Sequence, residues 1–236
     1  MNQARGSATV WIVIVATVAV VITGLVLLAN SGSTPSGTSS LPLDKVADSD
    51  WVVGNRQANV VLIEYSDFQC PACGAYQPIM LQLEKDYADK VAFVFRHFPL
   101  RSIHINAEMG SRAAQSAGLQ SKFFEMRDKL FVNQSSWSNS TDPSKIFEGY
   151  AQEIGLDVER FKSDLNSQAV RDAINVDVDS GKAAGVSGTP TFYLNGTKLK
   201  NPASVEAFKV LIDAAIKAAP ANANTNTSGA NANVAG

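Results

Sequence analysis

The only two cysteines of this 236-residue chain lie in one short stretch, SDFQCPACGAYQP, separated by a proline and an alanine. Pro71 suits the first position of a helix, because its missing N–H costs no hydrogen bond there. Cys70 would then face the unpaired N–H groups and the positive dipole of the helix end, which lower a thiol pKa. Cys73 would lie one turn further along the same face. The spacing therefore predicts a dithiol/disulfide pair, with Cys70 as nucleophile and Cys73 as resolving thiol.

The same two cysteines are open to three other interpretations: a structural disulfide, half of a metal site such as zinc, and coincidence. A domain of about 170 residues buries a sizeable core by itself, so its stability does not require a cross-link. A zinc site needs two more ligands, and His97 and His104 are the only histidines. Metal-binding Cys-x-x-Cys motifs usually lie in tight turns, and His97 falls within a predicted strand. We therefore expect no metal and no cofactor.

Two further features could support redox chemistry at this pair. Glu64 lies near the end of an otherwise apolar strand, where burial would raise its pKa and let it exchange protons with Cys73. An exposed carboxylate at the strand end is the simpler alternative. Thr189-Pro190 stands directly before a strand-like run, where a proline requires a sheet edge or a special turn. A cis bond there would expose the Thr189 backbone beside Cys70 to an extended substrate.

The elements that must position these residues are indicated by the hydrophobic pattern. Residues 58–65 (ANVVLIEY) and 91–98 (VAFVFRHF) are apolar runs of strand length. Between them, a helical pattern extends from Pro71 to about Asp89. A strand, a long crossover helix and a second strand form a βαβ unit, whose handedness predicts parallel strands.

After the second strand the pattern is helical for about 80 residues. Strand signals return at residues 191–199, where Asn195-Gly196 predicts a hairpin with a type I′ turn. Asn201-Pro202 is expected to open a last amphipathic helix. This order predicts an α/β, thioredoxin-like fold with a helical subdomain inserted at about 103–185, within a domain of residues 51–219.

The N-terminal residues 8–29 contain no charged side chain. As a helix, about 22 residues span roughly 33 Å, which is enough for the core of a bilayer. We expect a retained transmembrane anchor after a short segment of residues 1–7, rather than a cleaved signal peptide. Arg5 favours a cytoplasmic N-terminus, so the rest of this single-pass membrane protein would be extracytoplasmic. Disulfide chemistry is permitted in such a compartment.

Two further segments have compositions unlike that of the domain. Residues 30–50 are rich in Ser, Gly and Pro and predict a flexible linker, and residues 220–236 predict a disordered tail. The net charge of −2 and the absence of a basic run argue against nucleic acid as a partner. No segment suggests dimerisation, so a monomer is expected.

Three stretches resemble the DsbA-like thiol–disulfide oxidoreductases: VVLIEYSDFQCPACGAYQP, RHFPL and GKAAGVSGTPTFYLNG. The resemblance covers about Val53 to Lys217. It implies a thioredoxin fold with an inserted helical domain and a redox-active pair of Cys70 and Cys73. It also implies that Glu64 occupies a buried-acid position and that Pro190 is a cis-proline facing the cysteines, with Thr189 beside it in the substrate platform.

The function expected from these features is the formation of disulfides in reduced or unfolded exported proteins, through a mixed disulfide at Cys70. The resemblance implies a membrane thiol oxidase as the partner for reoxidation. Ala72 stands where the best-known oxidising members carry histidine, which implies a less depressed Cys70 pKa. A reductase or isomerase using the same residues is therefore one alternative. Two others belong to different classes: a tethered peptide-binding chaperone module that uses the edge by Thr189, and a zinc-binding module.

Overall fold

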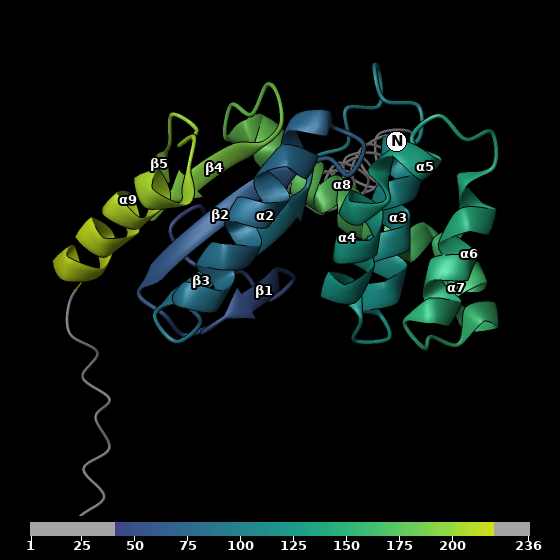
Figure 1. Cartoon of the computed structure of the whole chain (residues 1–236), viewed down its shortest axis with the longest axis horizontal. Helices are drawn as coiled ribbons and strands as arrows, with labels where there is room; N and C mark the ends of the chain where they lie inside the picture. Colours follow the sequence, from purple (N-terminus) through teal and green to yellow (C-terminus); the bar gives the residue numbers. More distant parts are fainter. Residues whose placement is uncertain (1–40, 220–236) are drawn as a thin grey trace, which may run out of the picture. The chain divides into compact units, whose positions relative to one another are not determined.

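The structure, a computed structural model, describes residues 41–219. Within this range lies one mixed sheet with the strand order β1-β3-β2-β4-β5 (Figure 1). The strands are β1 Trp51–Gly54, β2 Val60–Ser66, β3 Val91–His97, β4 Thr191–Leu194 and β5 Thr197–Lys198. β2 and β3 are parallel, as the βαβ pattern predicts, and the other neighbours are antiparallel. The sequence does not predict β1, because four residues at a sheet edge carry too short a pattern.

The helices in the described range are α2 Pro71–Asp86, α3 Ala107–Gly118, α4 Phe123–Val132, α5 Gln134–Trp137, α6 Pro143–Glu153, α7 Val158–Leu165, α8 Gln168–Ala183 and α9 Val205–Ala218. α3 to α8 form the predicted helical insertion between β3 and β4, and α3 to α7 are grouped beside the sheet (Figure 1). Close packing within this group is possible because α3 buries the small side chains Ala113, Ala114 and Ala117.

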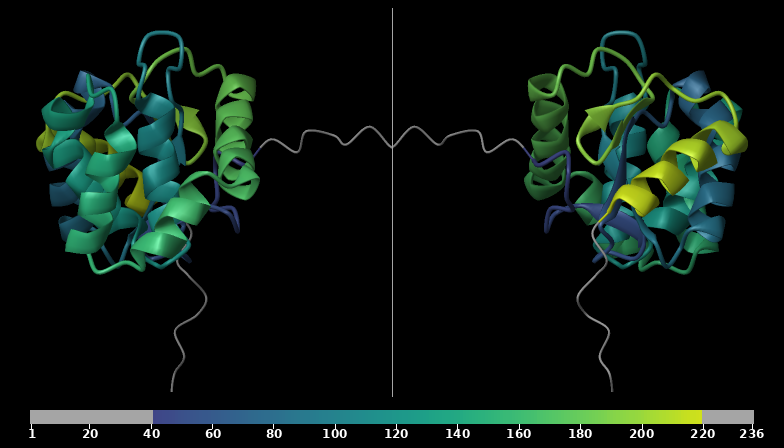
Figure 2. Two further views of the ribbon diagram at one scale, coloured as in Figure 1. Left: turned by 90° about the vertical axis from the view of Figure 1, so that its right-hand side faces the viewer. Right: turned by 90° about the vertical axis from the view of Figure 1, so that its left-hand side faces the viewer.

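β2 lies at the middle of the sheet and is buried along its whole length, so its successive side chains enter different cores. Leu62 belongs to the core that α2 and α9 complete. Ile63 and Tyr65 belong to the core that α8 completes on the other face (Figure 2). By the same alternation, Glu64 is directed towards the face that α2 covers. The central position of β2 therefore places the Glu64 side chain on the face of the sheet that α2 covers.

The chain turns after several of these elements at residues with a positive φ. α6 and α8 end before Gly155 and Gly185, and both glycines have a φ of 77°, in the left-handed region that favours glycine. Asn195 and Gly196 have φ values of 46° and 81°, as a type I′ hairpin turn requires. The predicted start of the last helix is wrong. α9 begins at Val205, because the Ser204 side chain accepts a hydrogen bond from the Ala207 N–H and caps it.

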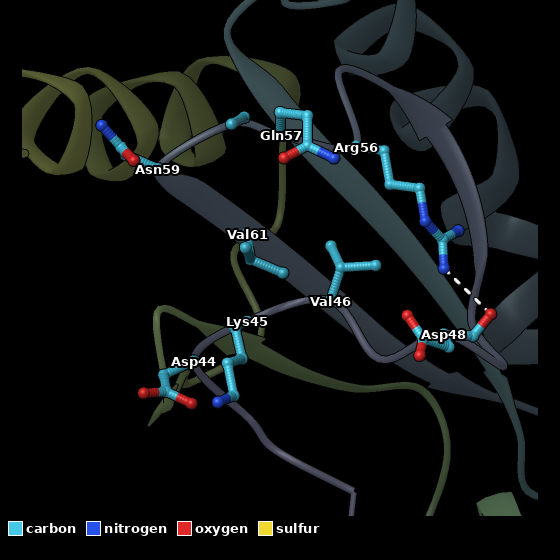
Figure 3. A pocket seen from close by; sticks show the side chains of 9 residues that line it. Asp44, Lys45, Val46, Asp48, Arg56, Gln57, Asn59 and Val61 are labelled. Carbon is cyan, nitrogen blue, oxygen red and sulfur yellow. Dashed lines mark hydrogen bonds between the residues drawn. The ribbon is translucent and has the colours of Figure 1, made fainter. Parts of the chain in front are cut away.

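Residues 41–50, assigned by composition to the flexible linker, instead pack against the domain. Arg56 donates hydrogen bonds to the carbonyl oxygens of Ala47, Asp48 and Asp50 at 2.7 to 3.0 Å, and Figure 3 shows the bond to Asp48. The buried guanidinium of Arg96 holds the Asp50 carboxylate by two bonds, at 2.8 and 3.0 Å. The linker prediction therefore fails for these ten residues, since composition says nothing about such tertiary contacts.

This N-terminal segment also borders an open pocket of about 370 Å³, seen from close by in Figure 3. None of the predicted site residues contributes to the pocket. It is lined by Asp44, Lys45, Val46, Asp48, Arg56, Gln57, Ala58, Asn59 and Val61. The other predicted segments, residues 1–7, 8–29, most of 30–50 and 220–236, lie outside the described residues. Between residues 41 and 219, no helix is both long enough and apolar enough to cross a membrane.

Candidate redox site

Cys70 lies at the N-terminal cap of α2, immediately before Pro71 at the first helical position. The first helical hydrogen bond runs from the Gly74 N–H to the Cys70 carbonyl oxygen, at 3.1 Å. Both cysteines are free thiols, and only 7% of Cys70 and 1% of Cys73 is exposed. The nucleophile predicted from sequence is thus the more accessible of two nearly buried sulfur atoms, at the dipole-positive end of a helix.

The loop before β4 meets Cys70 from the other side. Thr189–Pro190 is a cis peptide bond, and the Cys70 thiol donates a hydrogen bond to the Thr189 carbonyl oxygen at 3.4 Å. Two bonds fix this loop: Thr191 Oγ1 donates to the Gly188 carbonyl oxygen at 2.7 Å, and Asn201 Nδ2 donates to the Pro190 carbonyl oxygen at 2.8 Å. The structure therefore brings together two segments that lie about 120 residues apart in the sequence.

The environment of Cys70 favours its thiolate. A hydrogen bond from the Cys73 thiol is the largest of the effects that lower the Cys70 pKa to about 5, and partial burial opposes it. The Thr189 side chain and the backbone N–H groups of Ala72 and Cys73 lower the pKa further. The Thr189 hydroxyl is buried and has no other partner among the described residues. The Cys70 pKa is thus lowered by groups other than the side chain of residue 72, which is an alanine.

Cys73 and Glu64 form the buried side of the site. Burial raises the pKa of the Cys73 thiol well above its ordinary value, and the hydrogen bond with Cys70 and the nearby charge of Glu64 raise it further. Burial likewise raises the pKa of Glu64 to about 7. A 2.7 Å hydrogen bond that Ser66 Oγ donates to Glu64 Oε1 has the opposite, smaller effect and lowers this pKa. Glu64 is thus not an exposed carboxylate at the strand end. It is a buried acid with a raised pKa, and its charge acts on Cys73.

The charge of Glu64 is also influenced from the interface between α2 and the insertion. There the Arg127 guanidinium of α4 binds the Glu84 carboxylate of α2 by two bonds, at 2.5 and 2.9 Å. Arg127 lowers the pKa of Glu64 and Glu84 raises it, so this pair exerts two opposed and smaller effects. The dominant cause of the raised pKa remains burial.

The four candidate zinc ligands do not converge. His97 is fully buried on β3, where its Nε2 meets Gln115 Oε1 at 3.2 Å and burial lowers its pKa to about 4. His104 Nδ1 lies 2.6 Å from Asp67 Oδ2. In the described part of the chain, no group of three or more His, Cys, Asp or Glu residues is arranged to hold a metal ion.

Sequence reasoning missed two residues that fix the geometry of the turn before α2. Asp67 is fully buried, and its N–H lies 3.5 Å from Cys73 Sγ. Gln134 Nε2, from α5, donates to the carbonyl oxygens of Phe68 and Cys70 at 2.7 and 2.9 Å. A Cβ atom at Gly74 would lie 3.0 Å from Gln134 Oε1, so a glycine accommodates this amide. The sequence contains a signal for Asp67 alone, namely an acidic residue directly after an apolar strand. It contains no such signal for Gln134.

A comparison with protein-family models decides the classification. The model described as thioredoxin matches residues 47–214. The chain belongs to the thioredoxin family. This thioredoxin-family chain is 37% identical over 179 residues to Na(+)/H(+) antiporter NhaA 3 of Salinispora tropica, and 36% identical over 175 residues to NhaA 1 of Salinispora arenicola. The matches cover 76% and 74% of this chain, but only 26% of either relative, so the chain spans about a quarter of their length.

Solved structures with this fold come from several bacteria. Oxidised BdbD from Bacillus subtilis has a TM-score of 0.66 at 21% identity, over 74% of this thioredoxin-family chain and 96% of BdbD. The alpha-DsbA1 protein of Wolbachia pipientis has a TM-score of 0.66 at 19% identity, over 74% and 94% of the two chains. A thioredoxin-like oxidoreductase from Silicibacter pomeroyi has a TM-score of 0.63 at 23% identity, over 73% and 95%. These likenesses establish a DsbA-like thioredoxin fold with a helical insertion.

Proposed function

We propose that this chain is a thiol–disulfide oxidoreductase that introduces disulfides into exported proteins. The proposal rests on one observation: the pKa values of the two thiols are shifted in opposite directions. Cys70 has a pKa of about 5 beside the Thr189 carbonyl, while the Cys73 pKa is raised by burial next to Glu64. A stabilised thiolate favours the reduced form of the enzyme, so its disulfide is a stronger oxidant.

The reaction balances as a two-electron exchange. A substrate thiolate attacks Cys70 Sγ of the oxidised enzyme, the Cys70–Cys73 bond breaks, and a mixed disulfide forms. Cys73 leaves as a thiolate and takes a proton from Glu64, whose pKa of about 7 suits an acid at neutral pH. A second substrate thiolate then attacks the substrate sulfur of the mixed disulfide. Cys70 leaves as a thiolate, and two electrons have passed from the substrate to the enzyme.

Thr189 and Pro190 serve as the substrate platform in this proposal, because the Thr189 carbonyl oxygen lies 3.4 Å from the reacting Cys70 Sγ and Pro190 follows directly. An extended substrate segment would pair with the backbone at this edge. The chain has no third cysteine, so it cannot be reoxidised through an internal thiol relay. A membrane thiol oxidase that accepts the two electrons is therefore the proposed partner. The proposed location is the extracytoplasmic side of the cell membrane, with a monomer held by an N-terminal anchor.

The experiment compares the wild-type chain with a Cys70→Ser variant in peptide oxidation and insulin reduction. The variant is expected to lose at least about a thousandfold in rate, because it cannot form the Cys70–Cys73 disulfide and its remaining thiol, Cys73, is buried and has a raised pKa. Full activity in the variant would contradict the proposal. Equilibration with glutathione sets the direction: a potential near that of cytosolic thioredoxin would favour the reductase or isomerase alternative. Client binding that survives loss of both cysteines, without exchange activity in the wild type, would favour the chaperone alternative.

A further inference from the structure

Gln134, the first residue of α5, joins the helical insertion to the turn of residues 67–70, here called the redox turn. Its Nε2 donates to the Phe68 carbonyl oxygen at 2.7 Å and to the Cys70 carbonyl oxygen at 2.9 Å. Both partners only accept, so the two bonds use both N–H groups of the amide. Gly74 leaves room for this amide, because a Cβ there would lie 3.0 Å from Gln134 Oε1. One side chain of the insertion thus holds two carbonyl groups of the redox turn.

Gln134 is itself held in place by α5 and the residues that follow it. The Gln134 carbonyl oxygen accepts the Ser138 N–H at 3.0 Å and the Ser138 hydroxyl at 2.5 Å. Trp137 is fully buried, and its Nε1 donates to the Leu130 carbonyl oxygen at 2.9 Å. Gln69 Nε2 of the redox turn donates to the Ser138 carbonyl oxygen at 2.8 Å. The amide of Gln134 therefore reaches the redox turn from a backbone that is fixed on both sides.

The Cys70 carbonyl is the group through which this contact can influence the chemistry. The same oxygen accepts the Gly74 N–H at 3.1 Å, which is the first helical bond of α2. Cys70 has an extended backbone, with φ of −69° and ψ of 121°, so its carbonyl belongs to the helix while its side chain lies at the helix end. The N–H groups of Ala72 and Cys73 stabilise the Cys70 thiolate only while this orientation is kept. Fixing the carbonyl therefore fixes how the sulfur meets the end of the helix.

Another amide joins α2 to the insertion without contacting the redox turn through its hydrogen bond. Gln77 is 6% exposed, and its Nε2 donates to Asp128 Oδ1 of α4 at 2.9 Å. It lies seven residues after Cys70, about two helical turns along α2. Gln77 therefore matches Gln134 in residue type and in interface, and differs from it in the group that it holds.

We propose that Gln134 is a positioning residue of the redox pair, which holds the Cys70 carbonyl so that the sulfur faces the N–H groups of Ala72 and Cys73. Through this amide, the helical insertion takes part in setting how oxidising the Cys70–Cys73 disulfide is. A less stabilised thiolate disfavours the reduced enzyme, so an enzyme without the amide is a weaker oxidant. The inference rests on the proposed function for its effect on substrates, whereas its effect on the thiolate can be measured without any substrate.

The first test replaces Gln134 with methionine in the full chain, because methionine has a similar length but no N–H donor. We expect the Cys70 pKa, followed by the ultraviolet absorbance of the thiolate, to rise by about one pH unit. The equilibrium constant for the oxidation of glutathione by the enzyme disulfide should fall about tenfold, which corresponds to about 30 mV. Gln77→Met is the matched control and should change the Cys70 pKa by less than about 0.3 pH units. The melting temperature is followed for both variants.

The outcomes separate the inference from the proposed function. An unchanged Cys70 pKa and glutathione equilibrium in Gln134→Met, whatever its melting temperature, would overturn the inference and leave the redox function standing. An equal pKa rise in Gln77→Met would also overturn it, because it would show a general effect of the interface. A wild-type chain that does not exchange with glutathione would contradict the proposed function, while the Cys70 titration would still test the role of Gln134.

The second test displaces the amide without replacing Gln134, and it applies even if Gln134→Met does not fold. An alanine Cβ at position 74 would lie 3.0 Å from Gln134 Oε1 and 3.3 Å from Nε2, so the amide must shift. Alanine is the better helix former, so helix propensity alone predicts an equal or higher stability for Gly74→Ala. We nevertheless expect the Cys70 pKa to rise by about half a pH unit in this variant.

Combining Gly74→Ala with Gln134→Ala shows whether the two substitutions act through the same contact. In the absence of the amide, an alanine at position 74 has nothing to displace, so the double variant should have the Cys70 pKa of Gln134→Ala alone. An unchanged pKa in Gly74→Ala would overturn the positioning role. A rise that adds in full to that of Gln134→Ala would overturn it as well, because the two substitutions would then act independently.

Discussion

Two buried carboxyl groups on different sides of the sheet have similarly raised pKa values but different surroundings. Glu64, on β2, is directed towards α2 and has a pKa of about 7. Asp177, on α8, has a pKa of about 8, and burial is the largest cause in both cases. Glu64 raises the pKa of Cys73, whereas Asp177 Oδ2 accepts the His97 N–H at 2.9 Å.

A raised pKa does not by itself identify a proton carrier. Asp177 sits among structural groups, with Asp50 and Arg96 as the charges that act on it. Glu64 has an exchange partner, because its charge acts on a sulfur atom that must gain and lose a proton. Geometry next to the reacting atom, rather than the size of the pKa shift, distinguishes the two acids.

The largest expected effect concerns the cysteine beside Glu64. Cys73→Ser removes the resolving thiol, so mixed disulfides at Cys70 should persist and turnover should fall at least about a thousandfold. Non-reducing electrophoresis with a thiol-containing client detects the adduct. Cys70→Ser is the matched control and should give no adduct. Equal adduct formation by the two variants would contradict their assigned roles.

The next largest effect should separate the two acids in catalysis. Glu64→Gln keeps the shape but loses the proton exchange, and peptide oxidation at neutral pH should slow about ten- to a hundredfold. Asp177→Asn should stay within about twofold, since Asp177 is not among the groups that shift the pKa of Cys70 or Cys73. Stopped-flow kinetics measures the rate of peptide oxidation by the two variants. Similar losses in both would show that buried charge, rather than contact with Cys73, governs the rate.

The pH dependence of stability should reveal both acids with the same sign. Between the ordinary Glu64 pKa of 4.5 and its folded value of about 7, the folded protein retains a proton that the unfolded chain releases. Stability should therefore fall as pH rises through this window, and Glu64→Gln should remove that part of the fall. Asp177→Asn should likewise remove the part of the fall in stability that lies between pH 3.8 and about pH 8. Urea unfolding at several pH values measures this, and a stability that rises through either window would contradict burial as the cause.

The smallest effect should come from the hydrogen bond that stabilises the Glu64 carboxylate. Ser66→Ala removes the 2.7 Å bond to Glu64 Oε1, so the Glu64 pKa should rise by up to about one pH unit, while that of Asp177 stays unchanged. Carbon-13 NMR titration of the two carboxyl groups measures both values at once. A lower Glu64 pKa in this variant would overturn the assigned effect of Ser66.

Much of this site could be predicted because its residues lie next to strong local signals. An apolar strand, Pro71 and the cysteine spacing place Cys70 at a helix end, and Glu64 within an apolar run indicates burial. Asp67 and Gln134 could not be found in this way. Gln134 reaches Cys70 from a four-residue helix 64 positions away, and no local pattern encodes such a contact. The docking of residues 41–50 likewise depends on Arg56 and Arg96, which tertiary folding brings to it.

The central claim is that one thiol of the pair is acidic and the other is not, without a histidine between them. Ultraviolet absorbance of the thiolate in the reduced protein, followed across pH and compared with Cys73→Ser, tests it most directly. We expect one thiolate with a pKa of about 5, assigned to Cys70, and no second thiolate until well above pH 9. A Cys70 pKa near the ordinary thiol value, or two thiols that ionise together, would contradict it.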